Sequence, residues 1–216
     1  MEISSIQDHA DLTLDGSRVS LTPLALDNVD ELVRFGLDVR IWEKSPFPME
    51  SANDLRAYVE AALREKAEGQ SLPFVTRLRA SGDAVGCTRF GNVSTADLRA
   101  EIGWTWLAPQ HWRTGINVEA KLLMLTFAFD TLGLRRVEFK TDERNARSRA
   151  AIEALGATFE GTHRKHMVTR GGGVRNSVYY SILDDEWPGV RELLAARSTR
   201  SFESPVSSAG SKGQVK

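Results

Sequence analysis

Residues 115–132 restrict what this chain can fold into more than any other segment. Their apolar side chains, Ile116 and Phe129 among them, lie around most of the circumference of a helix rather than along one stripe. A helix of that kind has to be covered on nearly all sides, so it needs a sheet or further helices around it. Gly115 precedes the helix and Gly133 ends it. The sequence therefore predicts a buried helix packed against a sheet.

Three extended runs precede this helix, and a strand and a shorter helix follow it. The runs are 71–79, 84–92 and 99–107, and short turn-forming segments separate them. Short connections of this kind favour an antiparallel meander. Residues 135–141 then alternate with a period of two, and residues 145–155 form a helix. Such a succession of strand, helix and strand implies a crossover and some parallel pairing.

The rest of the chain completes one domain, for which 216 residues are sufficient. The further expected elements are a strand at 18–23, helices at 27–37 and 51–68, strands at 159–169 and 174–183, and a helix at 187–196. We place an N-terminal extension at 1–17 and the domain at 18–196. Residues 197–216 are rich in Ser, Gly and charged residues, which bury too little apolar area to become ordered, so we expect a flexible tail.

The charge balance argues against a nucleic-acid or membrane partner. The chain has 28 basic and 29 acidic residues and a net charge of -1, so no overall field attracts it to DNA, RNA or anionic lipid. It has no run of about 18 apolar residues that could span a bilayer, and residues 1–10 are polar where a signal peptide needs an apolar run. Cys87 is the single cysteine, so an internal disulfide is excluded. A cytoplasmic setting is the expectation.

The residues before the buried helix, 111–117, are the first candidates for chemistry. Main-chain N–H groups in the first turn of a helix have no partner within the helix and lie at the positive end of its dipole. They therefore suit a phosphate or diphosphate, and Gly115 lets the main chain approach such a ligand closely. A glycine near a helix start is also common in a simple turn, so both interpretations stand at this point.

Several segments in one order resemble a known family. Residues 101–107 read EIGWTWL, residues 109–115 read PQHWRTG, and the following helix carries Glu119 and Ala120. Together they resemble the cofactor-binding core of the RimJ/RimL-type branch of the GNAT superfamily of N-acetyltransferases. Residues 144–157, which begin RNARS and end ALGA, are similar to the second signature of the family. The resemblance covers almost the whole of the proposed domain.

The resemblance implies a mixed α/β fold, with a GNAT-like twisted mixed sheet of about seven strands flanked by helices. It implies that acetyl-CoA (coenzyme A) is the cofactor. An amine, either a protein N-terminus or a small molecule, would attack the thioester directly in a ternary complex. The sheet would be splayed beside Leu107, and a main-chain N–H near Trp106 or Leu107 would stabilise the oxyanion. No metal is implied, and dimers are common among relatives, so a homodimer is a further expectation.

By the same resemblance, the residues before and at the start of the buried helix would hold the diphosphate of CoA. They are Trp112, Arg113, Thr114, Gly115, Ile116 and Asn117. The superfamily commonly has Gln or Arg, then Gly, then Gly or Ala at three anchor positions, where this chain has Trp112, Gly115 and Asn117. Main-chain N–H groups would hold the ligand, so these side-chain differences are compatible with binding.

The second signature supplies further candidates. Asn145 is suited to cap the following helix, and by resemblance it hydrogen-bonds the pantetheine arm of the cofactor. Many relatives have a Tyr seven residues later as general acid for the departing thiolate, but this chain has Ile152 there. Ser148 is the nearest replacement by position, so it is a catalytic and a cofactor-binding candidate. Arg147 and Arg149 either meet outer phosphates or are solvated charges.

Glu101 is the candidate general base. The period of a strand puts Glu101 on one face with Gly103 and Thr105. The opposite face would hold the apolar side chains of this run: Ile102, Trp104 and Trp106. An alkyl amine arrives protonated near neutral pH, and a partly buried carboxylate beside a substrate channel can take that proton. The alternative is a surface carboxylate at the edge of a strand.

Other chemistries have less support. His163 and His166 are three residues apart in a predicted strand, so they would fall on opposite faces, which argues against a metal pair. Cys87 lies in an apolar run and is expected to be a small core residue rather than a reactive thiol. The apolar residues of the loop at 41–50 either border the acceptor or pin the loop onto the core: Trp42, Phe47 and Met49.

Two rival functions stay open at this stage. One is a non-catalytic acyl-CoA-binding sensor or assembly subunit, which the missing Tyr and the altered anchor positions would suit. The other is a nucleotide-binding module that uses the same helix start. Turnover of acetyl-CoA with a panel of amines separates an enzyme from the sensor, and thermal stabilisation by ATP or NAD without an effect of CoA would reveal the nucleotide-binding module.

Overall fold

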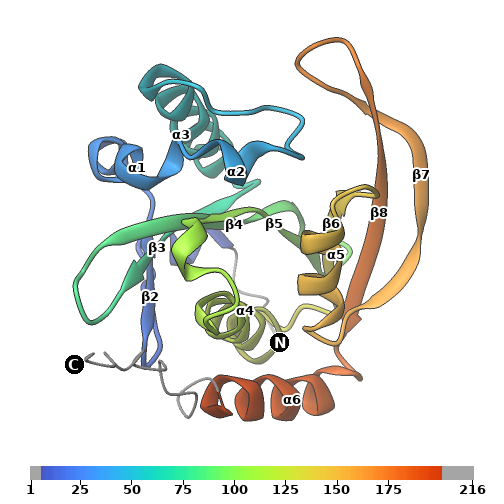
Figure 1. The fold of residues 1–216 in the computed structure, drawn as a ribbon. Coiled ribbons are helices and arrows are strands. Elements are labelled where there is room, and N and C mark those ends of the chain that lie inside the picture. Colours follow the sequence, from blue (N-terminus) through green and yellow to red (C-terminus); the bar gives the residue numbers. More distant parts are fainter. Residues whose placement is uncertain (1–5, 201–216) are drawn as a thin grey trace, which may run out of the picture.

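The extended runs assemble into one mixed sheet. The computed structural model describes residues 6–200, and its eight strands lie in the order β1-β2-β3-β4-β5-β6-β8-β7 (Figure 1). The strands are β1 Leu14–Asp15, β2 Val19–Pro23, β3 Leu72–Leu78, β4 Ala84–Ser94, β5 Arg99–Leu107, β6 Arg136–Asp142, β7 Thr158–Val168 and β8 Val174–Leu183. β5 and β6 are parallel and the other neighbours are antiparallel, which confirms the predicted meander and crossover. The strand beyond the expected seven is β1, which comes from the expected N-terminal extension.

Helices cover both faces of the sheet. They are η1 Ile6–His9, η2 Leu26–Asn28, α1 Val29–Gly36, α2 Val39–Trp42, α3 Ala52–Ala67, η3 Pro109–His111, α4 Ile116–Thr126, η4 Phe127–Thr131, α5 Ala146–Glu153 and α6 Trp187–Arg200. Figure 1 shows α1, α2 and α3 on one face, with α4 and α6 on the other. Among the described residues, none of the helices combines the length and the hydrophobicity that crossing a bilayer requires.

The two faces of the sheet bury separate hydrophobic clusters. The cluster under α4 and α6 includes Phe90 and Ile102, and the cluster under α1–α3 includes Leu55 and Trp106. Cys87 belongs to the second cluster and is 1% exposed, which confirms that it is a core residue. Burying a large apolar side chain stabilises the fold by about 1.5–3 kcal/mol. Since β5 contributes to both clusters, it is held from both sides.

The buried helix forms where the sequence predicts it, but in two segments. α4 ends at Thr126, and the π-helical segment η4 continues to Thr131. Gly133 then reverses the chain with a φ of +63°, a left-handed conformation that suits glycine. Met124 and Leu125 have no exposed surface, as expected of a helix that is apolar on most sides.

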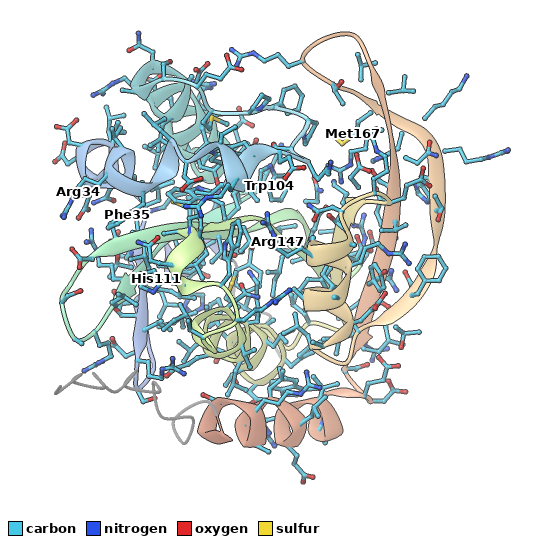
Figure 2. All side chains as sticks on the ribbon, viewed as in Figure 1. Arg34, Phe35, Trp104, His111, Arg147 and Met167 are labelled. Atoms are coloured by element: carbon cyan, nitrogen blue, oxygen red, sulfur yellow. The ribbon has the colours of Figure 1, made fainter. Side chains whose placement is uncertain are left out.

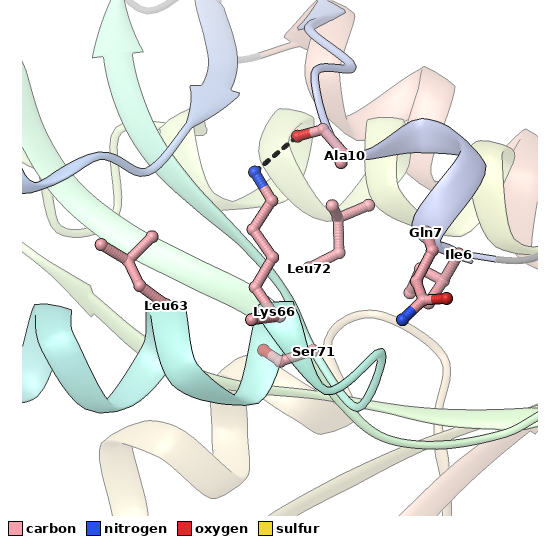
Figure 3. A pocket seen from close by; sticks show the side chains of 8 residues that line it. Ile6, Gln7, Ala10, Leu63, Lys66, Ser71 and Leu72 are labelled. Carbon is pink, nitrogen blue, oxygen red and sulfur yellow. Dashed lines mark hydrogen bonds between the residues drawn. The ribbon is translucent and has the colours of Figure 1, made fainter.

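The residues expected to be an N-terminal extension are built into the domain. Ile6 is 4% exposed and lies in the cluster under α4 and α6. Lys66 of α3 donates a hydrogen bond from Nζ to the carbonyl of Ala10 at 2.7 Å, beside a cavity of about 380 Å³ between η1 and α3 (Figure 3). β1 pairs with β2. This cavity contains no residue of the segments described below as the candidate site.

The last helix is longer than expected. We placed the end of the domain at Ala196, but α6 continues to Arg200 and so includes the first residues of the expected tail. Trp187, at the start of α6, stacks on Phe129 with the ring centroids 5.3 Å apart and donates a hydrogen bond to Asp130 at 2.7 Å. The remainder of the expected tail, 201–216, lies outside the described residues.

Candidate active site

β5 separates from β6 partway along its length. In the described chain, β5 pairs with β6 only as far as Glu101, whereas it stays paired with β4 as far as Leu107. The side of residues 102–107 that faces β6 is therefore unpaired, and we call it the open edge. Thr105 is exposed although β5 lies in the middle of the sheet, so solvent reaches the open edge. Splaying was expected beside Leu107, and it already begins after Glu101.

A β-bulge at Trp104 changes the direction of the side chains along the open edge. Gly103 pairs with Arg89 and Trp106 pairs with Cys87, so three steps along β5 match two along β4. Trp104 has a φ of +49°, a left-handed conformation that non-glycine residues rarely adopt. The extra residue shifts the alternation of side chains by one position in the rest of β5.

The bulge makes part of the predicted face assignment wrong. Thr105 does not share a face with Glu101, because its hydroxyl accepts a hydrogen bond at 2.7 Å from Lys121 of α4, on the other face. Trp104 and Trp106 lie on the Glu101 face instead. On that face, Cζ of Arg89 lies 4.0 Å from the Trp104 ring centroid. Trp106 belongs to the cluster under α1–α3. Strict alternation predicts the reverse because it assumes that no residue is inserted.

Glu101 is buried and oriented by two donors. Its side chain is 4% exposed, and Oε2 accepts hydrogen bonds from Asn92 Nδ2 at 2.7 Å and Lys140 Nζ at 3.0 Å. Oε1 has no hydrogen bond to the described chain, yet it is not among the fully enclosed polar atoms without a partner. Gly103 leaves room for it, since a Cβ there would lie 2.9 Å from Oε1. One oxygen is fixed and the other can accept a proton, so the alternative of a loose surface carboxylate is wrong.

The start of α4 presents a row of unpaired main-chain N–H groups. Arg113 and Gly115 have φ angles of +61° and +86°, and Gly115 is the N-cap of α4. The N–H groups of residues 113–118 donate no hydrogen bond within the described chain, and the next one, of Glu119, bonds the Gly115 carbonyl at 3.0 Å. Arg18 donates to a carbonyl of the same turn and adds a positive charge. This turn therefore fits an anionic group such as a phosphate.

Trp112 and Arg147 stack beside the end of the open edge. The indole N–H of Trp112 donates to the Leu107 carbonyl at 2.8 Å, and Arg147 Cζ lies 3.7 Å from the Trp112 ring centroid. Arg147 extends from α5 (Figure 2) and also donates to the Arg40 carbonyl at 3.5 Å, so it bridges separate elements. Burial lowers the pKa of Arg147. The Trp104 carbonyl is engaged as well, because it accepts a hydrogen bond from the Tyr58 hydroxyl at 3.0 Å. A ligand that pairs with the open edge therefore has the other main-chain groups on this side of residues 102–107 available.

Known proteins share this architecture. The acetyltransferase (GNAT) domain family matches residues 18–158. The chain belongs to the GNAT acetyltransferase family.

Relatives of this GNAT chain match it over most of their length. The uncharacterized N-acetyltransferase p20 of Bacillus licheniformis is 26% identical over 179 residues, which cover 82% of this chain and 99% of p20. The crystal structure of a GCN5-related N-acetyltransferase from Brucella melitensis has a TM-score of 0.79 and 28% identity, covering 86% of this chain and 85% of that one. Mycobacterium smegmatis RimJ in complex with CoA-disulfide has a TM-score of 0.70 and 26% identity, covering 82% and 88%.

Membership of the family confirms the predicted fold class and acyl donor, and the similarity to RimJ agrees with the predicted branch. This GNAT chain is an acetyl-CoA-dependent N-acetyltransferase, and its acceptor is an amine. The interpretation of the chain as an enzyme is therefore favoured over both rivals, the acyl-CoA sensor and the nucleotide-binding module.

The second signature, residues 144–157, forms α5 and its two ends. Asn145 caps the helix, because its Oδ1 accepts a hydrogen bond from the N–H of Ser148 at 3.1 Å, which confirms the predicted cap. Arg149 donates from Nε to the Tyr180 hydroxyl at 3.1 Å, so its guanidinium contacts β8. Ile152 is 8% exposed and belongs to the core, away from solvent.

Only some of the apolar residues in the loop expected at 41–50 pin this segment to the core. Trp42 is the last residue of α2, is 8% exposed, and donates a hydrogen bond from its indole N–H to the Gly36 carbonyl at 2.6 Å, so it packs into the core. Met49 packs against the cluster under α1–α3, whereas Phe47 is 50% exposed. The same loop helps to enclose a cavity of about 220 Å³, which is lined by Glu43, Lys44, Ser45, Pro46, Asp142, Arg144 and Thr169.

His163 and His166 lie on one face of β7, contrary to the prediction. Their ring centroids are 5.4 Å apart, and both rings contact Tyr179 of β8. Lys165 has a φ of +50° and the pairing of β7 with β8 shifts in this stretch, so a bulge again inserts a residue. Even so, the described residues contain no group of three or more His, Cys, Asp or Glu side chains arranged to hold a metal.

Lys121 of α4 is the notable residue that the sequence analysis missed. It is 4% exposed, and its Nζ donates to the hydroxyl oxygens of Thr88 and Thr105, each at 2.7 Å. Burial lowers the pKa of Lys121 to about 7. The available signal was a lysine within a helix that is apolar on most sides, because a charged residue there has to be buried or paired.

Proposed function

We propose that this enzyme transfers the acetyl group of acetyl-CoA to a primary amine by direct attack in a ternary complex. One observation carries the proposal: a buried carboxylate, Glu101, lies where the open edge begins, and a row of unpaired amides follows shortly after it ends. The amides of residues 113–118 suit the diphosphate, and the unpaired side of the backbone of residues 102–107 suits the amides of the pantetheine arm. Acetyl-CoA supplies the electrophilic thioester when it is bound.

The residues proposed to contact the cofactor come from β5, from the turn before α4 and the first residues of α4, and from the N-terminal end of α5. They are Trp106, Leu107, Trp112, Arg113, Thr114, Gly115, Ile116, Asn117, Asn145 and Ser148. Trp106 and Leu107 are 5% and 8% exposed, so they contribute their main chain rather than their side chains. Arg147 joins this set because its stack on Trp112 places a guanidinium between α5 and the turn before α4. Ser148 also stays a proposed catalytic residue.

Glu101 is proposed to take the proton from the attacking amine. Asn92 and Lys140 hold Oε2, and Oε1 is left to accept that proton. Because Glu101 lies on the face covered by α1–α3, the amine approaches the open edge from that face. The relationship to RimJ/RimL-type enzymes supports a protein N-terminus as acceptor, and a small-molecule amine is the other candidate.

Replacing Glu101 tests the proposal. We expect Glu101→Gln to lower kcat by about 10²–10⁴-fold because the general base is lost, while the affinity for CoA is unchanged. Glu138 pairs with Glu101 across β5 and β6 and forms an ion pair with Arg136 at 2.8 Å, so Glu138→Gln is the matched control and keeps its activity. The measurement is acetyl-CoA turnover with a panel of N-terminal peptides and small amines.

Three outcomes would contradict parts of the proposal. A wild-type kcat in the Glu101→Gln enzyme would place the base elsewhere. Parallel initial-rate patterns would indicate a covalent acetyl-enzyme, whereas a ternary complex requires intersecting patterns. Binding of CoA with no acetylation across the whole panel would restore the sensor as the function of this chain.

A further inference from the structure

Lys121 places a buried amino group next to the open edge, on the face of the sheet that α4 covers. Its side chain is enclosed between α4 and the sheet, with the hydroxyls of Thr88 and Thr105 as its hydrogen-bond partners. Within the described chain it forms no ion pair with a carboxylate, unlike Lys140 on β6. An ammonium group that is buried among neutral groups is costly, so this amine exchanges its proton more readily than an exposed lysine does.

Thr105 connects this amine to the open edge. It is the exposed residue of β5, whereas Thr88 is 2% exposed and enclosed. A hydroxyl can accept a hydrogen bond from Lys121 and at the same time donate its own proton. Within the chain that proton has two acceptors in reach, the Thr88 hydroxyl at 2.8 Å and the Gly103 carbonyl at 3.3 Å, and a ligand at the open edge can replace the longer of these contacts.

The two faces of β5 therefore offer opposite proton chemistry. Glu101 lies on the face of α1–α3 with one oxygen able to accept a proton, and Thr105 lies on the face of α4 with an amine behind it. Acylation of an amine by a thioester removes one proton from nitrogen and leaves a sulfur anion that takes one up. A proton acceptor on one side of the open edge and a proton donor on the other match these two requirements.

We propose that Lys121, acting through the hydroxyl of Thr105, delivers a proton to the sulfur of CoA as it leaves. The proposal rests on the proposed function. The amine attacks in its neutral form, after its ammonium proton has passed to solvent. As the C–N bond forms and the C–S bond breaks, Glu101 accepts the proton that the nitrogen then loses, and Thr105 gives its hydroxyl proton to the sulfur. Lys121 then restores the proton on Thr105 Oγ1. Lys121 ends neutral and Glu101 protonated, and exchange with solvent resets both. Thr105 is the catalytic residue of this pair and Lys121 its positioning residue.

Burial is the cause of the lowered pKa of Lys121, because uncharged groups surround its Nζ. The groups that β4 and β5 place against Nζ are threonine hydroxyls, and Met124 is its uncharged neighbour on α4. Glu119, the other charged residue of α4, is bonded to Ser17 at the β1–β2 turn. Burial lowers the pKa of Lys121 to about 7, so both forms are populated near neutral pH, as a proton donor requires.

Substitutions at both positions test the proposal by activity. We expect Lys121→Met and Thr105→Val each to lower kcat by about 10²-fold, with a much smaller change in KM for acetyl-CoA. The wild-type kcat should fall at alkaline pH as Lys121 loses its proton, and Lys121→Met should lose this alkaline limb. Thr105→Ser keeps the hydroxyl and should restore the profile. Lys66→Met, which removes a lysine beside the N-terminal cavity, is the control and should keep the wild-type profile.

A titration of Lys121 tests the same contact without turnover. The titration midpoint of Nζ, followed by nuclear magnetic resonance in isotope-labelled protein, should differ between complexes with CoA and with CoA that lacks the sulfur atom. Thr105→Val should remove that difference, because the hydroxyl between the two groups is gone. Both complexes use the whole chain, and neither depends on an acceptor amine.

The results separate this proposal from the proposed function. An unchanged alkaline limb in Lys121→Met, or equal titration midpoints in the two complexes, overturns the role of Lys121. A wild-type enzyme that acetylates no amine counts against the proposed function instead. In that case the titration still decides whether Lys121 senses the sulfur atom through Thr105.

Discussion

Lys121 makes the stability of the fold depend on pH. In the folded chain burial lowers its pKa from the ordinary value of 10.5 to about 7. Between these two values the unfolded chain binds more protons than the folded chain, so the free energy of unfolding rises with pH, by up to about 1.4 kcal/mol per pH unit. Below the folded pKa both states are protonated, and the full cost of burying the charge is present.

The variant Lys121→Met isolates this dependence. From about pH 7.5 to about pH 9.5, we expect the wild type to gain stability relative to Lys121→Met, which has no group to titrate at this position. Urea unfolding of both proteins at several pH values measures the difference. Lys66→Met should follow the wild type, since that lysine is not enclosed in the core. If the wild type and Lys121→Met have the same pH dependence, protonation of Lys121 is not linked to folding.

At the scale of elements, the two glycines at the ends of the buried helix are both expected to affect stability, but only one of them is expected to affect CoA binding. Gly115 and Gly133 have φ angles of +86° and +63°, so an alanine at either position costs about 1–2 kcal/mol of stability. Only Gly115 lies in the turn with unpaired amides. We expect Gly115→Ala to weaken CoA binding by about tenfold, the equivalent of 1.4 kcal/mol, and Gly133→Ala to leave it unchanged. Calorimetric titration with CoA measures both, and equal affinities would remove the diphosphate from this turn.

The elements that the sequence predicted are those with local signals. Asn145 caps α5 as its residue type indicates, and β6 follows the alternating pattern predicted for residues 135–141. The bulges at Trp104 and Lys165 have no such signal, because a non-glycine residue takes a positive φ only where tertiary packing imposes it. Resemblance to the family identified Glu101. Which face of the sheet its neighbours in β5 occupy depends on the bulge at Trp104, and the contact of Lys121 with Thr105 depends on the packing of α4 against the sheet, so neither could be predicted.

At the scale of the whole molecule, the domain begins earlier than the sequence pattern suggests. The regular alternation starts after residue 17, and the residues before it contribute a two-residue strand and a few isolated contacts, such as the burial of Ile6. Isolated contacts have no period, so sequence analysis assigns such residues to an extension. In the folded chain they are joined to α4, the helix whose first turn we assign to CoA.

Glu119 makes that connection, and its removal tests whether the N-terminal residues fold as one unit with the helix. It is 4% exposed and accepts hydrogen bonds from the Ser17 hydroxyl at 2.8 Å and the Arg18 N–H at 3.0 Å. Glu119→Ala leaves these donors without a partner, so we expect a loss of about 1–3 kcal/mol in the free energy of unfolding. Glu119→Gln keeps an acceptor oxygen and should lose less. Because Arg18 also bonds the turn before α4, Glu119→Ala should weaken CoA binding as well. Wild-type stability and affinity in Glu119→Ala would show that the residues before β2 are independent of the site.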